Sequence, residues 1–224
     1  MYNVSDTCQV KGLDLIYSKY FGFDYKGIFV EVGAFDGESF SNTSCLADSG
    51  WRGIYIEPIK SHCDMCIERH KNNNVSVIQC SIGTEENEKD IYILDGGLTT
   101  TKLEQVQMFS EMGWSRNYVE SKCRQFRLDR IFSDLNIGPN FDVLVVDVEG
   151  NEEDVFNSFD LDYWYPKMII AELIDEHNSF QKYDSYIETN RKLRNKIIES
   201  NYAEIYKDDI NTIFVSKDLF YRIM

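Results

Sequence analysis

Short runs of β-branched and other apolar residues alternate along the chain with segments of helical periodicity. The runs lie at 28–32, 53–57, 75–80, 142–147 and 168–173, and helical segments follow at about 39–48, 59–71, 128–136, 151–158 and 182–200. Strands that are joined through helices run parallel, and the helices then cover both faces of the sheet. The alternation therefore predicts an α/β protein with a mostly parallel sheet and helices on both faces.

The C-terminal part of the chain breaks this alternation. Two short apolar runs, at 203–206 and 212–215, are separated only by the turn-like residues 207–211. Strands that are joined so tightly pair antiparallel, because a parallel crossover needs a dozen or more residues. The sheet is therefore predicted to end in an antiparallel hairpin.

The length of 224 residues fits one elaborated domain, at about 150 residues per average domain. No repeat and no Ser/Gly/Pro-rich linker divides the chain, so we expect a single domain over residues 1–224 with an N-terminal helix at about 9–20. Residues 83–127 interrupt the regular pattern and contain a short predicted strand at 91–94. An insertion of this length in a compact domain is typical of an element that covers a substrate.

Composition excludes several classes of protein. The net charge of −15 disfavours binding to DNA, RNA or anionic membranes. No apolar run approaches the roughly 18 to 20 residues of a membrane span, and the N-terminus lacks the basic and apolar pattern of a signal peptide, so we expect a cytoplasmic protein. Without an export signal the six cysteines are weak support for disulfides, and the C-x-x-C pair Cys63 and Cys66 is interpreted as two helix residues. His62 and His70 lie in the same predicted helix and are expected to face solvent.

The first candidate site is the strand and glycine turn at residues 29–39. Gly33 and Gly37 let the backbone turn sharply and approach a ligand, and the free N–H groups of a following helix suit an anionic group. The dinucleotide fingerprint G-x-G-x-x-G requires glycine where the chain has Phe35, which weakens an NAD-binding interpretation. Glu31 lies inside the strand, where a buried carboxylate needs a partner such as the amine of a ligand.

Glu57 ends the second predicted strand, just before Pro58. An acid at the tip of the second strand, roughly 20 residues after the glycine turn, holds the ribose diol in doubly wound folds. The spacing therefore predicts a ribose-binding role for Glu57.

With these motifs identified, the sequence resembles the FkbM-like family of S-adenosylmethionine (SAM) dependent methyltransferases. The resemblance spans about residues 27–175 and rests on F-V-E-V-G-A-F-D-G at 29–37, S-N-T at 41–43, W-R-G-I-Y-I-E-P at 51–58 and D-V-E-G at 147–150. It implies the seven-stranded, Rossmann-like methyltransferase sheet, with the hairpin supplying its antiparallel strand. The chain departs from the common family pattern at Phe35, where many members have Asn, and at Val145, where many have Lys.

The resemblance also implies which residues hold the cofactor. The methionine part would lie near Gly33, Ala34, Asp36 and Gly37, its carboxylate near the S-N-T segment, and the adenine beside residues 80–82. The full set of expected cofactor-binding residues is Glu31, Gly33, Ala34, Asp36, Gly37, Ser41, Asn42, Thr43, Glu57, Pro58, Ser81, Ile82 and Asp147.

A second candidate site follows the strand at 142–147. Asp147, Glu149 and Glu152 come after it, and Glu172 ends the next strand, at the sheet edge where such folds bind ligands. His177 is the first candidate for a base near neutral pH, followed by Asp147 and Glu149. The acids Asp147, Glu149 and Glu172 could instead hold Mg²⁺ or Ca²⁺. Glu152 and Asp154 have an alternative interpretation as helix N-terminal acids favoured by the dipole.

We therefore predict a SAM-dependent methyltransferase that acts on oxygen of a sugar or another small hydroxylated acceptor. The oxygen preference comes from the resemblance alone. Two alternatives stay open, namely a methyltransferase-like interaction module without catalysis and, less favoured, an NAD-linked oxidoreductase. Residues 96–127 are expected to shape the acceptor pocket, with contacts from Trp114, Arg116, Tyr118 and Arg124.

Overall fold

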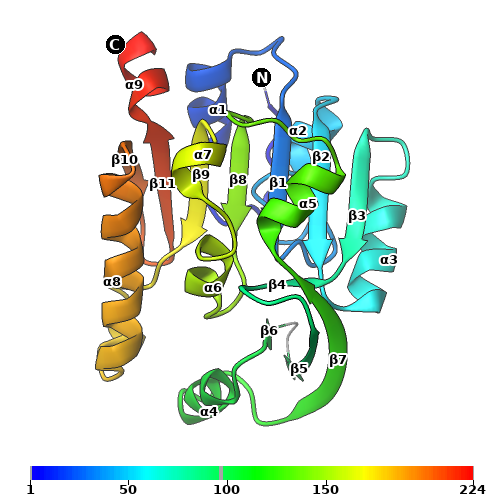
Figure 1. The fold of residues 1–224 in the computed structure, drawn as a ribbon, viewed down its shortest axis with the longest axis vertical. Helices are drawn as coiled ribbons and strands as arrows, with labels where there is room; N and C mark the ends of the chain where they lie inside the picture. The colour runs from blue at the N-terminus through cyan, green and yellow to red at the C-terminus, as the bar shows by residue number, and fades with distance from the viewer. Residues whose placement is uncertain (1, 96–97, 224) are drawn as a thin grey trace.

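A computed structural model describes residues 2–95 and 98–223 (Figure 1). Its main sheet has seven strands in the order β10-β11-β9-β8-β1-β2-β3. Their bounds are β1 Ile28–Val32, β2 Arg52–Glu57, β3 Val75–Gln79, β8 Val143–Val146, β9 Met168–Glu172, β10 Tyr202–Lys207 and β11 Asn211–Ser216. β11 pairs antiparallel with both β9 and β10, and the other pairings are parallel. The predicted parallel sheet and its C-terminal hairpin are confirmed.

Apolar side chains on both faces of the central strands bury them between two helical layers. Val30, Leu144 and Ile169 face one core, which is covered by α5 (Leu128–Asp134), α6 (Glu152–Phe156), α7 (Leu161–Trp164) and α8 (Asp184–Glu199). Phe29 and Val145 face the other, which is covered by α1 (Leu13–Phe21), α2 (Ser44–Asp48), α3 (Lys60–Arg69) and α9 (Lys217–Ile223). Continuous apolar runs such as 143–146 fit because neither face meets solvent.

The helix predicted over 39–48 is shorter than expected. It begins only at Ser44, because the preceding residues make side-chain contacts that compete with a helix. The hydroxyl of Ser41 accepts hydrogen bonds from the N–H groups of Thr43 and Ser44, each at 3.1 Å, and Phe40 has a left-handed backbone with φ of 62°. Serine and threonine favour such local turns over a continued helix.

The insertion forms a second, four-stranded sheet in the order β4-β7-β5-β6. Its strands are β4 Ser81–Ile82, β5 Glu88–Leu94, β6 Thr99–Thr100 and β7 Tyr118–Phe126, and α4 (Leu103–Glu111) connects β6 to β7. The predicted strand at 91–94 is part of β5. Figure 1 shows this small sheet below the carboxyl ends of the main strands. Residues 96 and 97, which belong to the expected acceptor-side segment, lie outside the described residues.

The C-x-x-C pair is part of a helix, as expected. Cys63 and Cys66 both lie in α3, and all six cysteines are buried free thiols. Within the described part of the chain, no helix combines the length and the apolar character that a membrane crossing requires.

Candidate active site

A cavity of about 430 Å³ lies at the carboxyl ends of β1, β2, β8 and β9. Its walls include most of the residues that the sequence singled out: Glu31, Gly33, Ala34, Ser41, Glu57, Pro58, Ser81, Ile82, Asp147, Glu149, Glu172 and His177. Asp36, Gly37, Asn42 and Thr43 are not among the lining residues. The structure therefore joins the two candidate sites into one cavity.

Gly33 lets β1 turn at the cavity floor. The N–H groups of Gly33 and Ala34 both donate to the carbonyl oxygen of Ile56, at 2.9 and 3.1 Å. Gly33 has φ of 89°, and a Cβ atom there would lie 1.6 Å from the carbonyl oxygen of Asp147. No side chain fits at this position, so glycine allows the loops after β1 and β8 to meet.

Glu57 is held in one orientation at the end of β2. Its Oε2 accepts the N–H of Phe35 at 3.0 Å, and its Oε1 accepts the N–H of Ile59 at 2.9 Å. His62 Nδ1 lies 3.4 Å from the same Oε1. His62 was interpreted from the sequence as a solvent-facing residue, and that interpretation is wrong. Because each carboxylate oxygen has two lone pairs, Glu57 can still accept hydrogen bonds from a ligand in the cavity.

Glu31 finds its partners in the S-N-T segment. Its carboxylate accepts hydrogen bonds from the hydroxyls of Ser41 (2.9 Å) and Thr43 (2.6 Å) and from the N–H of Asn42 (3.2 Å). Burial raises the pKa of Glu31 to about 7, although these hydrogen bonds oppose the shift. Ser41 reaches the cavity, whereas Asn42 and Thr43 support it by fixing Glu31.

The raised pKa of Glu31 makes stability depend on pH. The folded protein binds the proton up to about pH 7, whereas the ordinary value is 4.5, so stability falls as pH rises through this window. The substitution Glu31→Gln removes the titration. Between pH 5.5 and 8, wild type should lose about 2 kcal/mol more unfolding free energy than the variant. Urea unfolding at the two pH values tests this, and parallel losses in both proteins would contradict it.

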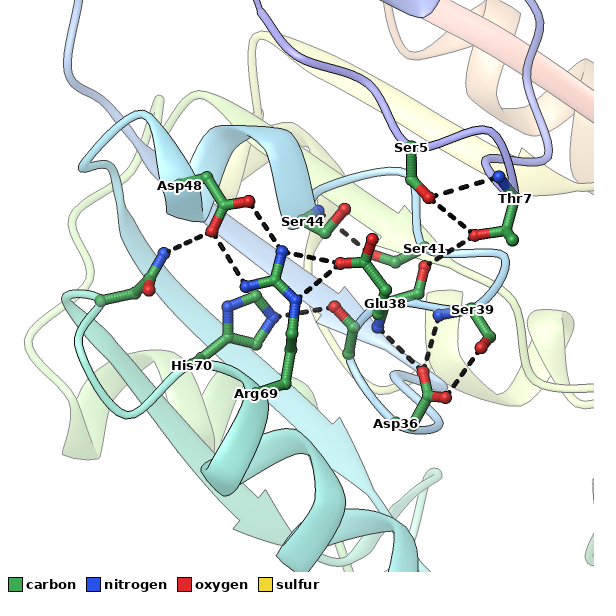
Figure 2. A network of polar contacts seen from close by, with 12 residues as sticks. Ser5, Thr7, Asp36, Glu38, Ser39, Ser41, Ser44, Asp48, Arg69 and His70 are labelled. Atoms are coloured by element: carbon green, nitrogen blue, oxygen red, sulfur yellow. Dashed lines mark hydrogen bonds and ion pairs between the residues drawn. The ribbon is translucent and has the colours of Figure 1, made fainter.

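The loop at residues 36–39 is anchored from the side of α3 (Figure 2). Asp36 accepts the N–H groups of Glu38 and Ser39 at 2.9 and 2.7 Å, and Arg69 pairs with Glu38 at 2.7 Å. The ring of His70 is buried and its Nε2 lies 2.8 Å from the carbonyl oxygen of Gly37. The expectation of a solvent-facing His70 is therefore also wrong. Asp36 and Gly37 shape the loop behind the cavity wall.

Three carboxyl groups converge at the other end of the cavity. Asp147, Glu149 and Glu172 each offer an oxygen atom within 4.8 Å of the others. The Oε2 atom of Glu172 is buried and lacks a hydrogen-bond partner among the described residues. Burial raises the pKa of all three, and for Glu149 and Glu172 the charge of Asp147 adds to the shift. In the described part of the chain, no lysine, arginine or histidine forms an ion pair with them.

The loop after β8 presents Glu149 in a strained conformation. Glu149 has φ of 53°, which is left-handed and unfavourable for a residue with a side chain. Glu152 holds the loop by accepting the N–H groups of Val148 and Gly150, each at 3.1 Å. Glu152 thus supports the loop from the start of α6, whereas Asp154 pairs with Lys102 at 3.0 Å.

His177 lies at the cavity wall beside two aromatic rings. Its ring centroid is 5.3 Å from that of Phe180 and 6.5 Å from that of Trp114. Its Nδ1 accepts the N–H of Ser179 at 3.2 Å. Neutral histidine carries a single ring proton, so this contact places the proton on Nε2 and makes that atom a donor.

The insertion is tied to the site through hydroxyl and amide groups. Thr101 donates to the Asn151 side chain at 2.7 Å, and Asn151 donates to Thr100 at 3.0 Å. Of the acceptor contacts expected from the sequence, Trp114 lines the cavity, whereas Arg116, Tyr118 and Arg124 are not among its lining residues.

Gln9 lines the cavity but was not among the site residues predicted from the sequence. Its amide Nε2 donates to Asp147 Oδ2 at 2.8 Å, and its Oε1 accepts from Asn42 Nδ2 at 3.3 Å. The N-terminal helix expected at about 9–20 begins only at Leu13, so Gln9 lies in the irregular segment before α1. No local pattern distinguishes it from other polar residues there.

Comparison with known proteins identifies the family. Residues 31–203 match the methyltransferase FkbM domain, whereas a search of the curated proteins gave no match. The fold resembles methyltransferase FkbM from Methylobacillus flagellatus KT, with TM-score 0.50, 14% identity and coverage of 85% of this chain and 43% of that chain. This chain therefore spans less than half of that protein. It also resembles the O-methyltransferase from Bacillus cereus in complex with SAH, with TM-score 0.50, 16% identity and coverage of 96% and 83%.

Both structural likenesses concern the fold, since both identities are low. The match to the FkbM domain identifies the family as well as the fold, because it covers most of the chain. It includes the glycine turn, Glu57 and the acids after β8. The family expected from the motifs is confirmed: the chain belongs to the family of methyltransferases with an FkbM domain.

Proposed function

We propose that this protein transfers a methyl group from SAM to a hydroxyl group of a sugar or another small polyhydroxylated acceptor. The observation that carries the proposal is the geometry of Glu57. Two backbone N–H groups fix its carboxylate at the end of β2, facing the same cavity as the Gly33 turn. A carboxylate so held suits the two hydroxyls of a ribose.

The acid cluster at the other end favours a positively charged ligand. When bound, SAM supplies a methyl group already activated on a positive sulfonium, and it leaves as SAH with a neutral thioether. The cluster of Asp147, Glu149 and Glu172 has no cationic partner among the described residues, so a positive ligand would favour the ionised form of these acids and would be stabilised by it. The site should therefore prefer SAM to SAH.

Methyl transfer to a hydroxyl requires a group that takes up the hydroxyl proton. Glu149 is the best placed carboxyl, since it lines the cavity and no hydrogen bond engages its side chain among the described residues. Its raised pKa makes it a stronger proton acceptor when ionised. His177 presents an Nε2 proton and would orient the acceptor oxygen as a donor.

Aromatic rings at the cavity wall support a saccharide acceptor. Phe40 and Trp114 line the cavity although 60% and 45% of their surfaces are exposed. Exposed aromatic rings near carboxylates suit a sugar, since a pyranose offers an apolar face to a ring and hydroxyl donors to the acids.

Magnesium is a second candidate for hydroxyl activation. Asp147, Glu149 and Glu172 form an all-oxygen set, and the unpartnered Oε2 of Glu172 fits a cation ligand. These residues would hold Mg²⁺, which would lower the pKa of a bound hydroxyl. Treatment with EDTA separates the two candidates. Unchanged turnover would indicate that a carboxyl group alone activates the hydroxyl, whereas turnover that is lost and then restored by Mg²⁺ would indicate activation by the metal.

Isothermal titration tests the proposed cofactor. Wild-type protein should bind SAM at one site and SAH more weakly, and it should give no heat with NAD. SAH lacks the positive charge of SAM, so its attraction to the partly screened acids is weaker. We expect SAH to bind less favourably than SAM by about 1 kcal/mol, or roughly fivefold. No binding of SAM at millimolar concentration would contradict the proposal and favour the non-catalytic module.

A further inference from the structure

The segment before α1 is anchored against the cavity. Tyr2, Cys8 and Val10 are buried in the core cluster on the α1 side of the main sheet. The N–H of Val10 donates to Asn42 Oδ1 at 3.3 Å, and the thiol of Cys8 donates to the same oxygen at 3.4 Å. Gln9 stands between these two anchors and lines the cavity, so its backbone position is fixed from both sides.

The amide of Gln9 bridges two parts of the site. Because an ionised carboxylate can only accept hydrogen bonds, the Nε2 end must face Asp147, where it lies 2.8 Å from Oδ2. The Oε1 end accepts from Asn42, whose own N–H holds Glu31. The NH₂ group and the carbonyl oxygen of the Gln9 amide are therefore both hydrogen-bonded. With the amide fixed in this way, its NH₂ group holds the Asp147 carboxylate in one orientation.

Asp147 needs such a partner because its other neighbours are acids. The carboxyl groups that interact with it electrostatically are Glu31, Glu149, Glu152 and Glu172. Glu172 shares a hydrogen bond with Asp147 when its carboxyl group is protonated, and Gln9 donates a second one at 2.8 Å from an amide that cannot lose its proton. Without it, repulsion from the neighbouring acids would favour rotation of the Asp147 carboxylate away from its present orientation.

We propose that Gln9 is a positioning residue that orients the Asp147 carboxylate toward the positive charge of SAM, so that the segment before α1 forms part of the cofactor site. The proposal rests on the proposed function. Gln9 acts through Asp147, so its contribution to SAM binding should disappear when Asp147 is neutral.

A double-mutant cycle tests this dependence. SAM affinity is measured by isothermal titration for wild type, Gln9→Met, Asp147→Asn and the double variant. We expect Gln9→Met to weaken SAM binding roughly tenfold and to add less than about twofold in the Asp147→Asn background. Both effects should be smaller for SAH, which lacks the sulfonium charge. The control Gln107→Met, on the exposed side of α4, should bind SAM like wild type.

Further variants separate positioning from packing. Gln9→Asn keeps the amide but shortens the side chain by one methylene, so it should lose the hydrogen bond to Asp147 and bind SAM about as weakly as Gln9→Met. Thermal unfolding without cofactor shows which variants fold, and Gln9→Asn replaces Gln9→Met in the cycle if the latter does not. Equal losses from the Gln9 substitution in both Asp147 backgrounds would overturn the proposal. Wild type that fails to bind SAM would instead refute the proposed function.

Discussion

Replacing Glu57 with glutamine should weaken SAM binding by roughly 10- to 100-fold. The amide keeps the size of the side chain but removes its charge, and its NH₂ end must face either the Phe35 or the Ile59 N–H, where both groups are donors. A hydrogen bond to a charged group contributes about 1.5 to 3 kcal/mol, which sets the expected range.

The Glu57→Gln experiment has a matched control in Glu85→Gln. Glu85 is exposed in the insertion and does not line the cavity, so the second variant loses the same charge away from the site. Titration with SAM should show the loss for Glu57→Gln alone, and thermal unfolding should confirm that both variants fold. An affinity equal to that of wild type would remove Glu57 from the cofactor site.

Gly33→Ala should prevent stable folding. A methyl group would lie 1.6 Å from the Asp147 carbonyl oxygen, and this oxygen belongs to backbone that cannot move without separating the loops after β1 and β8. The left-handed φ of 89° adds a further cost. We expect a loss of more than about 4 kcal/mol, which is a large part of the stability of a typical domain.

Gly12→Ala separates the two causes of the Gly33→Ala defect. Gly12 has φ of 72°, yet a Cβ atom there meets nothing within 4 Å. This variant should lose only about 1 to 2 kcal/mol, the cost of the left-handed backbone alone. Circular dichroism and urea unfolding compare the two variants. Similar stabilities would show that the contact with Asp147 is not limiting.

The sequence predicted the parts of the molecule that depend on local pattern. Apolar runs such as 143–146 located the strands, and the short connection at 207–211 identified the hairpin. Glu57 and the acids after β8 were expected at one sheet edge because parallel strands end on the same side. The structure places them around one cavity.

Features that depend on tertiary contacts were not predicted. Gln9 reaches Asp147 across 138 positions of sequence, and no local rule indicates such a contact. The start of α2 was misplaced because Ser41 and Thr43 bond to Glu31 in another element. His62 and His70 were assigned to solvent since helical periodicity alone does not show what packs over a helix.

The cavity combines groups that oppose stability. Glu149 has strained backbone, and burial raises the pKa of Glu31 and of the three clustered acids. Such groups persist where surrounding contacts fix them, and they concentrate at functional sites. The supports here are Gln9, the S-N-T segment and Glu152, which together hold the carboxylates that face the cavity.

The central claim is that this cavity binds SAM with its ribose at Glu57 and its positive charge near Asp147. The most direct measurement is a paired titration of wild-type protein with SAM and SAH. The account predicts one site for each ligand, with SAM bound several-fold more tightly. Equal affinities would contradict the role of the acid cluster, and no binding of either ligand would contradict the claim as a whole.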